Sequence, residues 1–347
     1  MIKFFRLILF ALLFFHVSLT AQYDNLKFKH LNSNDGLSQN FISCILQDKA
    51  GFLWFGTKDG LNRYDGYNFK VYRHDPFDTT SVSGNFIFSM YEDSKGRLWI
   101  GTDELNLFLP DINAFKRVNL KLKADKKNNQ NKFDRIISIT EDKYGLLWIG
   151  TDSGLIYYNP ETDSSEMYFL KQDDNSVLSD NFISSLSSDD SLIIIGTHNG
   201  MKLLNIDLLK DGKFKLGKIS HLPPAELINS KRSVLTQLRT SDNIIYAGTP
   251  SGLLKINIST GESDYIHYKG LVFSPQWLNR ILSICQDKNG NLWLASSGSL
   301  IIYNPVRNNF KYYFHNPKDE QSLSMNSITS VYADRGGKIW IGTAGKG

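Results

Sequence analysis

The chain repeats one short stretch, Gly51-Phe52-Leu53-Trp54-Phe55-Gly56-Thr57, at near-regular intervals along almost its whole length. Close copies end in Gly-Thr pairs that begin at residues 101, 150 and 342, and a sixth copy ends in Ala295-Ser296. Two weaker copies, which lack tryptophan, carry their pairs at residues 196 and 248. Successive pairs therefore begin 45 to 52 residues apart. Seven copies at a period of this size are typical of a repeat architecture.

Each unit contains four short runs rich in aromatic and β-branched residues, separated by turns that hold Asp and Gly. In the third unit these runs cover residues 136–142, 145–151, 155–158 and 166–169. Such runs, punctuated by turn residues, predict short antiparallel strands. Four strands at this period are the pattern of a β-propeller blade. We therefore predict an all-β fold, a β-propeller of four-stranded antiparallel blades with seven repeats, in which the tryptophans pack between blades.

The N-terminus has the features of a secretory signal peptide. Lys3 and Arg6 come before an apolar run at residues 7–19, and small residues precede Gln22. An uncleaved anchor is the alternative, but the run is shorter than the ~18 apolar residues that favour a membrane span. We predict a signal peptide at residues 1–21 and an exported β-propeller at residues 22–347.

The two ends of the propeller are expected to differ from a complete blade. Residues 26–31 resemble the fourth run of the first unit, residues 69–72, so we expect a strand that pairs with the last blade. The seventh unit stops at Gly347, directly after its second strand. We therefore predict six complete blades and an incomplete seventh with an exposed edge. We expect a fragment of a longer protein; the alternative is a partner that finishes the blade.

Composition excludes several classes of function. Cys44 and Cys285 occupy non-equivalent positions in different units, which favours buried thiols over a disulfide. The basic residues between 116 and 132 lie in an Asn-rich insertion, and with a net charge of only +4 we expect no nucleic acid to be bound. The chain has no metal-binding cluster, phosphate loop or nucleophile motif. We therefore expect no cofactor, no metal and no catalytic residues.

Two of the repeats carry a more specific resemblance. Residues 93–102 read Asp-Ser-Lys-Gly-Arg-Leu-Trp-Ile-Gly-Thr, and residues 142–151 follow the same order. In these residues the chain resembles the two-component regulator propeller repeat, whose core is D-x-x-G-x-L-W-I-G-T. Residues 28–38 also resemble the start of the periplasmic sensor half of hybrid two-component system proteins. The fourth and fifth units depart from the pattern because they lack the tryptophan and the turn glycine.

The resemblance implies a periplasmic, ligand-sensing domain that is not an enzyme. Its usual ligands are oligosaccharides derived from polysaccharides. Relatives carry further sensor domains, a membrane helix and a kinase downstream, and these are missing from this chain. The full-length context also allows a homodimer.

A series of polar residues precedes the first run of each unit. The series consists of Asn40, Asn85, Asp134, Asn181, Arg232, Asn279 and Asn326. Because the first strand of a blade lines the central channel, these residues are expected to form a ring at one mouth. Amides and charged groups suit a hydroxyl-rich ligand. The alternative is that each Asn ends its incoming loop with an Asx-type turn.

Three more residues are candidates for the same ligand site. Arg135 and Arg280 directly follow members of the polar series, and Trp277 lies in the loop that leads to Asn279. The tryptophan either stacks on a sugar ring or packs beneath its own loop. The leading hypothesis is thus an oligosaccharide-sensing propeller. The alternatives are a propeller-fold glycan lyase or hydrolase, which needs a convergent pair of carboxylates, and a truncated protein-docking scaffold.

Overall fold

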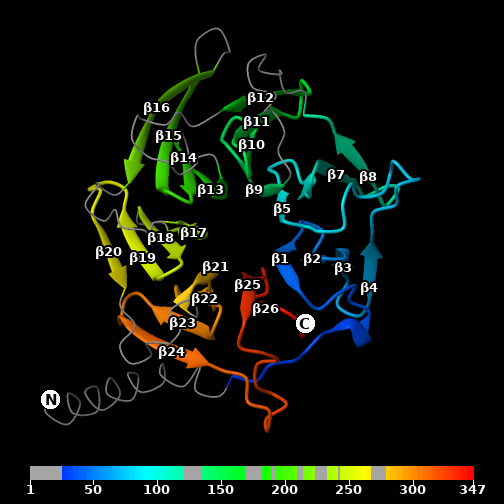
Figure 1. The fold of residues 1–347 in the computed structure, drawn as a ribbon, viewed down its shortest axis with the longest axis vertical. Coiled ribbons are helices and arrows are strands. Elements are labelled where there is room, and N and C mark those ends of the chain that lie inside the picture. The colour runs from blue at the N-terminus through cyan, green and yellow to red at the C-terminus, as the bar shows by residue number, and fades with distance from the viewer. Residues whose placement is uncertain are drawn as a thin grey trace, which may run out of the picture.

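The computed structural model describes residues 26–120, 135–168, 182–189, 192–208, 214–222, 233–240, 243–266 and 279–347. The predicted signal peptide lies outside these residues. Within them, six four-stranded antiparallel sheets and one two-stranded sheet surround a central opening (Figure 1). The predicted all-β propeller with four-stranded blades is confirmed, with six such blades and a seventh sheet of two strands. Among the described residues, no helix combines the length and apolar character needed to cross a bilayer.

The strands follow the sequence order from the inside of each sheet to its outside. The first three sheets comprise β1 (Ile42–Gln47), β2 (Leu53–Thr57), β3 (Gly60–Tyr64) and β4 (Phe69–Tyr72); β5 (Ser89–Glu92), β6 (Leu98–Gly101), β7 (Leu105–Leu109) and β8 (Ala114–Val118); and β9 (Ile136–Glu141), β10 (Leu147–Thr151), β11 (Leu155–Asn159) and β12 (Ser164–Tyr168). The next two comprise β13 (Ile183–Asp189), β14 (Leu192–Thr197), β15 (Gly200–Leu208) and β16 (Phe214–Leu222); and β17 (Thr236–Arg239), β18 (Ile244–Thr249), β19 (Gly252–Asn257) and β20 (Ser263–Ile266). The last two comprise β21 (Ile281–Gln286), β22 (Leu292–Ser296), β23 (Leu300–Asn304) and β24 (Asn309–Tyr313); and β25 (Ile328–Ala333) with β26 (Ile339–Thr343).

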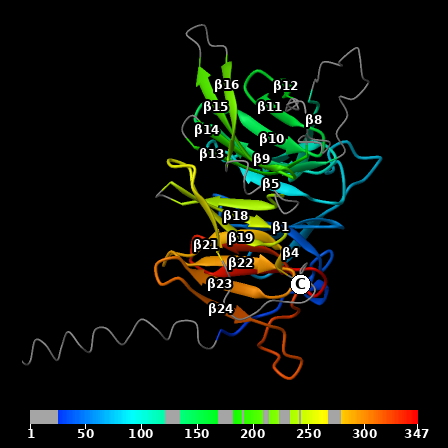
Figure 2. The same cartoon turned by 60° about the vertical axis from the view of Figure 1, so that its left-hand side comes forward.

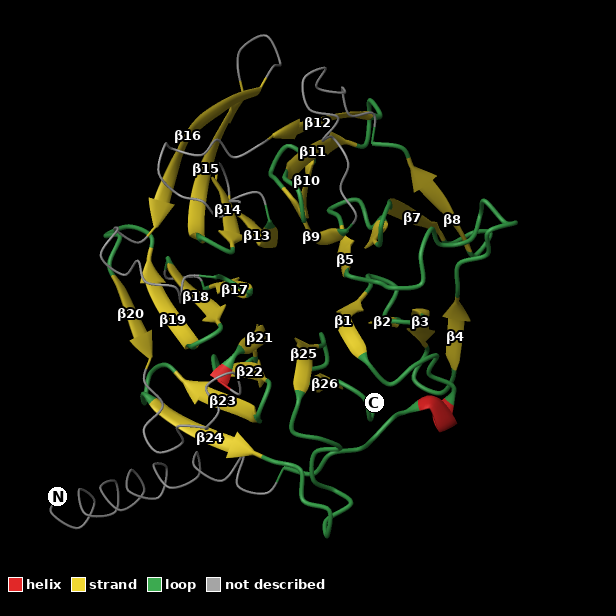
Figure 3. Cartoon of the chain, viewed as in Figure 1, coloured by secondary structure: helices red, strands yellow, loops and turns green. Residues whose placement is uncertain are grey.

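The first strand of every sheet faces the central opening, as Figures 1 and 3 show. Each of these inner strands contacts the next around the ring, and β25 contacts β1. Thr329 Oγ1 donates a hydrogen bond of 2.6 Å to the carbonyl oxygen of Ile42 across that junction. In the turned view of Figure 2 the successive sheets lie in layers, with β18 and β19 next to β21 and β22. The ring is therefore continuous at its inner strands, and the incompleteness of the seventh sheet is confined to its outer side.

The recurring Gly-Thr pair has a packing role in the sheets that carry it. A Cβ atom at Gly150 would lie 2.5 Å from Cγ2 of Ile183, the first residue of the next inner strand. Glycine at this position therefore lets neighbouring sheets approach closely. Gly342 meets Ile42 in the same way, at 2.6 Å from its Cβ, so the seventh sheet packs on the first as the others pack on their neighbours. The threonine closes the following hairpin, since Thr57 Oγ1 donates to the carbonyl oxygen of Gly60 at 2.8 Å.

The tryptophans pack between sheets, as predicted from their spacing. Trp54 is fully buried and contacts Leu98 and Ile100 of the neighbouring sheet. Its indole N–H donates to Oδ2 of Asp48, six residues earlier, at 2.7 Å. The same bond, at 2.8 to 2.9 Å, recurs for the tryptophans at 99, 148, 293 and 340. The turn aspartate thus satisfies the one polar group of a buried indole, as burial of a tryptophan requires.

The fourth and fifth sheets lack both members of this pair. Ile194 and Tyr246 stand in place of the tryptophan, and Ser188 and Thr240 stand six residues before them in place of the aspartate. Ile194 and Tyr246 are still buried, so the packing position is kept without the Asp and Trp pair. The Asp and Trp of the repeat therefore behave as one structural unit.

The N-terminal segment lies against the end of the ring without forming a strand in the structure. Phe28 N–H donates to the carbonyl oxygen of Gln321 at 2.9 Å, and Phe28 packs on the core between the sixth and seventh sheets. Residues 26–31 are not in a strand, and both they and β26 line one groove. Their expected pairing with the last blade therefore stays a prediction. A short 3-10 helix, η1 (Ser33–Asp35), follows and is capped by Asn32.

Candidate functional site

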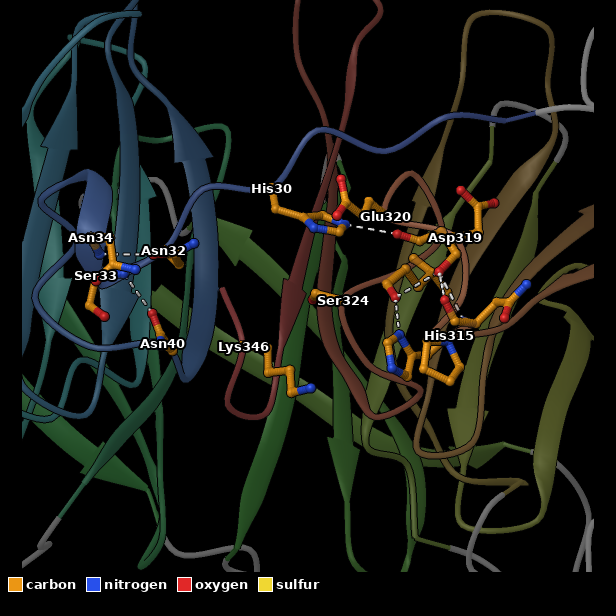
Figure 4. A pocket seen from close by; sticks show the side chains of 14 residues that line it. His30, Asn32, Ser33, Asn34, Asn40, His315, Asp319, Glu320, Ser324 and Lys346 are labelled. Carbon is orange, nitrogen blue, oxygen red and sulfur yellow. Dashed lines mark hydrogen bonds between the residues drawn. The ribbon is translucent and has the colours of Figure 1, made fainter.

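A polar pocket of about 620 Å³ lies between residues 30–40 and the loop at residues 315–324 (Figure 4). Amide, imidazole, carboxylate, hydroxyl and ammonium groups line it, from His30, Asn32, Ser33, Asn34, Asn40, His315, Asn316, Asp319, Glu320, Ser322, Ser324 and Lys346. Asn32, Ser33, Asn34 and Asn40 lie on one side, His30, His315, Asp319 and Glu320 lie on the other, and Lys346 lies between them (Figure 4). Donors and acceptors of several kinds therefore converge on one space.

The first wall of the polar pocket is organised around η1. Asn32 caps it, since its Oδ1 accepts the N–H of Asn34 at 2.8 Å, while Asp35 Oδ2 accepts the N–H of Asn32 at 2.9 Å. Asn40 holds the same turn, because its Oδ1 accepts the N–H of Ser33 at 2.9 Å. The amide oxygen of Asn40 is thus used within the protein. Its Nδ2 donates to no acceptor among the described residues and remains available to a ligand.

The second wall is a loop closed by its own hydrogen bonds. His315 N–H donates to Asn326 Oδ1 at 2.6 Å, and Asn316 N–H donates to Ser322 Oγ at 2.9 Å. Asp319 Oδ1 accepts the N–H of Gln321 at 3.0 Å. These bonds hold the loop without any ligand. The pocket wall is therefore preformed.

Both imidazoles of the polar pocket have one nitrogen committed to a carbonyl oxygen. His30 Nε2 lies 2.8 Å from the oxygen of Ser322, and His315 Nδ1 lies 2.6 Å from that of Leu323. A carbonyl oxygen only accepts, so these nitrogens carry the proton. In the neutral rings, His30 Nδ1 and His315 Nε2 are then acceptors. Glu320 and Lys346 form no ion pair with any described residue, so opposite charges are also available to a ligand.

The loop of the second wall has a twin elsewhere in the chain. His74 N–H donates to Asn85 Oδ1 at 2.8 Å, Asp75 N–H donates to Ser81 Oγ at 2.9 Å, and His74 Nδ1 donates to the oxygen of Val82 at 2.9 Å. In both loops the His and the Asn are eleven residues apart. The amide oxygens of Asn85 and Asn326 therefore hold their loops through residues eleven positions earlier, which is not the local Asx-type turn of the alternative interpretation. Their role in binding a ligand stays a prediction.

The remaining predicted site residues that the structure describes do not line the polar pocket. Arg135 is exposed and pairs with Asp152, with Nε 3.1 Å from Oδ2. Asn279 is half-buried and Arg280 exposed, and both precede β21. The other members, Asp134, Asn181, Arg232 and Trp277, lie outside the described residues. Of the predicted residues that the structure describes, only Asn40 lines the polar pocket.

A second depression, which we call the strand groove, runs along the outer edge of β26. Its volume is about 570 Å³. Apolar side chains line most of it, from Phe28, Leu31, Leu37, Phe55, Tyr64, Phe69, Ile339, Trp340 and Ile341. The sequence predicted an exposed edge here, but not that the first sheet and the N-terminal segment would wall it.

Burial affects the reactivity of the two cysteine thiols. Both cysteines are free thiols. Burial is the main cause that raises the pKa of Cys44 to about 12 and that of Cys285 to about 12. Neither thiol is therefore ionised near neutral pH. No group of three or more His, Cys, Asp or Glu side chains within the described residues is placed to hold a metal ion.

The repeats match a known family model. The two-component regulator propeller model matches residues 36–59, 81–104, 132–153, 277–298 and 322–345. Five segments of the chain are two-component regulator propeller repeats. Two-component regulator propeller repeats thus supply the first, second, third, sixth and seventh sheets. The fourth and fifth units, which lack the Asp–Trp bond, are the ones that the family model does not match.

Similar sequences and structures occur within larger proteins. A stretch of 79 residues is 52% identical to Histidine kinase P4 of Formosa agariphila, which covers 23% of this chain and 6% of that protein. The extracellular domain of the putative hybrid two component system BT3049 of B. thetaiotaomicron has a TM-score of 0.72 at 24% identity, over 93% of this chain and 41% of that one. The extracellular domain of the putative hybrid two component system BT4673 of B. thetaiotaomicron has a TM-score of 0.67 at 22% identity, over 93% of this chain and 39% of that one.

The fold also occurs outside sensors. PorZ, a surface component of the type-IX secretion system of Porphyromonas gingivalis, has a TM-score of 0.63 at 14% identity, over 91% of this chain and 47% of that one. At these identities the solved structures support the propeller fold alone. The chain spans less than half the length of each of these structures.

Proposed function

We propose that this chain is the ligand-binding propeller of an exported sensor region in a hybrid two-component system. Its ligand in this proposal is an oligosaccharide derived from a polysaccharide. The polar pocket beside Asn40 carries the proposal, because a sugar presents many hydroxyl groups that both donate and accept hydrogen bonds. The pocket volume of about 620 Å³ falls in the range of small-ligand sites, ~300–1,000 Å³.

Each kind of group in the polar pocket can form hydrogen bonds with such a ligand. Asn40 Nδ2 and the Lys346 ammonium donate to sugar oxygens. Glu320 and the free ring nitrogens of His30 and His315 accept from sugar hydroxyls. Since the loop and η1 are held by internal hydrogen bonds, little ordering entropy opposes binding.

The setting in a larger protein is part of the proposal. The family, and the similarity of 79 residues to a histidine kinase, support a sensor that passes its signal to a kinase. Export by the N-terminal signal peptide would place the propeller in the periplasm. Signalling would then require further sensor domains and a kinase, and it is compatible with a homodimer of the full-length protein.

Binding without catalysis is the function that the polar pocket fits best. A glycosidase needs two carboxyl groups on opposite sides of the scissile bond, roughly 5–9.5 Å apart. Asp319 and Glu320 are neighbours in one loop and lie on the same side of the pocket (Figure 4). One of them, Asp319, is engaged by a backbone N–H. This arrangement favours a sensor over a glycan hydrolase.

A thermal-shift screen against neutral and acidic oligosaccharides tests the proposal, with titration calorimetry of every hit. We expect at least one oligosaccharide to bind, and Lys346→Ala and Glu320→Gln each to weaken it about 10-fold, equivalent to one strong hydrogen bond to a charged group. Arg307→Ala, at an exposed turn remote from the pocket, serves as the control. Unchanged binding in both pocket variants would refute the assignment of the ligand to the polar pocket. Release of shorter sugars would favour a glycan lyase or hydrolase.

A further inference from the structure

Two segments of the chain approach the polar pocket and the twin loop (residues 74–85) in the same way. Phe28 N–H donates to the carbonyl oxygen of Gln321 at 2.9 Å, and Phe115 N–H donates to that of Thr80 at 2.8 Å. Gln321 and Thr80 occupy the same place, six residues after the histidine of each loop. The chain beside the polar pocket can therefore be compared, residue by residue, with the chain beside the twin loop.

An arginine fills the space beside the twin loop. Arg117, two residues after Phe115, donates from Nε to the carbonyl oxygen of Ser81 at 3.2 Å. Its Nη2 donates to the carbonyl oxygen of Asp78 at 3.1 Å and to Ser81 Oγ at 3.0 Å. Hydrogen bonds from Thr80 lower the pKa of the Asp78 carboxyl, and the nearby positive charge of Arg117 lowers it further. The twin loop thus binds a cation that the chain itself supplies.

A histidine occupies the position of this arginine beside the polar pocket. His30, two residues after the bonded phenylalanine, donates from Nε2 to the carbonyl oxygen of Ser322 at 2.8 Å, and Ser322 is the counterpart of Ser81. The imidazole ends there, whereas the guanidinium of Arg117 continues to two more acceptors. The counterparts of those acceptors are the carbonyl oxygen of Asp319 and Ser322 Oγ. No side chain of the described residues donates to either, so both can accept from a ligand.

A carboxylate lines the polar pocket at a place where the twin loop has none. Glu320 stands where the twin loop has Thr79, and it directly follows Asp319. Neither carboxylate forms an ion pair with any residue that the structure describes. With both imidazoles neutral, Lys346 is the one cation among the lining residues, and it lies between the walls while the two carboxylates lie on the side of His30 (Figure 4). Negative charge therefore prevails on that side of the pocket.

We propose that the polar pocket binds a protonated amino group of its ligand at the acceptors that correspond to those of Arg117 in the twin loop. The inference rests on the proposed function, and it narrows the ligand to an oligosaccharide of amino sugars with free amines. The amine donates to the carbonyl oxygen of Asp319 and to Ser322 Oγ, and Glu320 balances its charge. An ammonium group has three donors and no acceptor, which matches a site made of acceptors. Hydrogen bonds with a charged donor are about twice as strong as neutral ones.

Titration calorimetry of the whole chain with a glucosamine trimer and with its fully N-acetylated counterpart tests the proposal, because the two sugars differ only at the amines. At a pH where the free amines are protonated, we expect the glucosamine trimer to bind at least ~10-fold more tightly, since acetylation removes the charge and two of the donors. Equal or tighter binding of the acetylated trimer overturns the proposal. Tighter binding of an arginine tripeptide than of the glucosamine trimer would assign these acceptors to a peptide, and it overturns the proposal as well.

Two variants test where the amine binds. His30→Arg supplies a guanidinium of the chain's own, as Arg117 does in the twin loop, so it should weaken binding of the glucosamine trimer at least ~10-fold without lowering the melting temperature. Glu320→Gln keeps the shape of the side chain and removes its charge, so it should reduce the preference for the free amine, and it covers the case in which His30→Arg does not fold. Glu262→Gln, at an exposed turn of the fifth sheet, is the matched control and should bind as the parent does. Unchanged affinity in the folded His30→Arg variant, or an unchanged preference in Glu320→Gln, overturns the proposal.

Failure of the amine site can be told apart from failure of the proposed function. A neutral oligosaccharide whose binding is weakened by Lys346→Ala, together with no preference for the glucosamine trimer over its acetylated form, would refute the amine site and leave the oligosaccharide sensor standing. Binding of no oligosaccharide of any charge would overturn both.

Discussion

Replacing Asp93 by alanine should be among the most destabilising single changes in this propeller. Asp93 is 1% exposed, and its Oδ2 accepts the indole N–H of Trp99 at 2.9 Å and Nε of Arg97 at 2.6 Å. Its Oδ1 accepts the backbone N–H groups of Lys95 and Arg97 at 3.0 and 2.8 Å. The alanine variant leaves these donors unpaired, and Trp99 itself is 1% exposed.

The loss of stability in Asp93→Ala follows from the hydrogen-bond donors that are left buried without an acceptor. Each unsatisfied buried donor costs about 1–3 kcal/mol, and several donors lose their acceptor here, although Arg97, whose side chain is 25% exposed, keeps its ion pair with Glu161. We therefore expect Asp93→Ala to lower the free energy of unfolding by about 3–5 kcal/mol. The matched change, Asp334→Ala, removes the same bond to Trp340, but both residues are half-buried beside the strand groove. Water replaces the lost partner there, so the cost should be about 1–2 kcal/mol.

Urea unfolding followed by far-UV circular dichroism measures both costs. The comparison requires a single transition with an unchanged slope, since repeat arrays can unfold in parts. A cost below ~1 kcal/mol for Asp93→Ala, or equal costs at the two positions, would refute the view that the Asp–Trp bond is a buried structural unit.

Three further predictions concern packing, ionisation and the polar pocket. Gly150→Ala should destabilise the chain by about 1–3 kcal/mol because its methyl group would meet Ile183, whereas Gly345→Ala, which meets nothing within 4 Å, should be neutral in the same urea experiment. The pKa of the Cys44 thiol is raised from 9.0 to about 12 in the folded chain, so its contribution to stability is complete below pH 9 and is lost as the pH rises toward 12. Cys44→Ala should therefore flatten the fall in melting temperature above pH 9, and an unchanged fall would contradict the shift. Nitrogen NMR of the neutral rings should show the proton on Nε2 of His30 and on Nδ1 of His315, because an acceptor oxygen faces each of these nitrogens, and the opposite tautomers would contradict the described pocket.

Most of the fold could be predicted because its determinants are local. The turn Asp, the Gly and the β-rich runs lie within one unit, and seven repetitions remove the ambiguity of any single run. The Asp–Trp bond could also have been found, since the spacing of six residues is the same in five units. Its joint loss at Ser188/Ile194 and Thr240/Tyr246 is visible in the sequence alone.

The polar pocket could not be predicted in the same way. His30 and Ser322, which are bonded in the structure, are 292 residues apart, and only closure of the ring brings them together. The strand groove depends on the same closure, because Tyr64 and Phe69 reach β26 across the junction between the first and last sheets. One local signal was overlooked, the His-to-Asn spacing shared by residues 74–85 and 315–326. It would have shown that Asn85 and Asn326 hold their own loops.

The central claim, that the polar pocket is where the ligand is sensed, is tested most directly by hydrogen–deuterium exchange with and without the oligosaccharide selected by the thermal-shift screen. We predict slower exchange of the backbone amides in residues 30–40 and 315–326 on binding, with the twin loop at residues 74–85 unchanged. Protection at residues 74–85 or at the inner strands, with none around the polar pocket, would contradict the account.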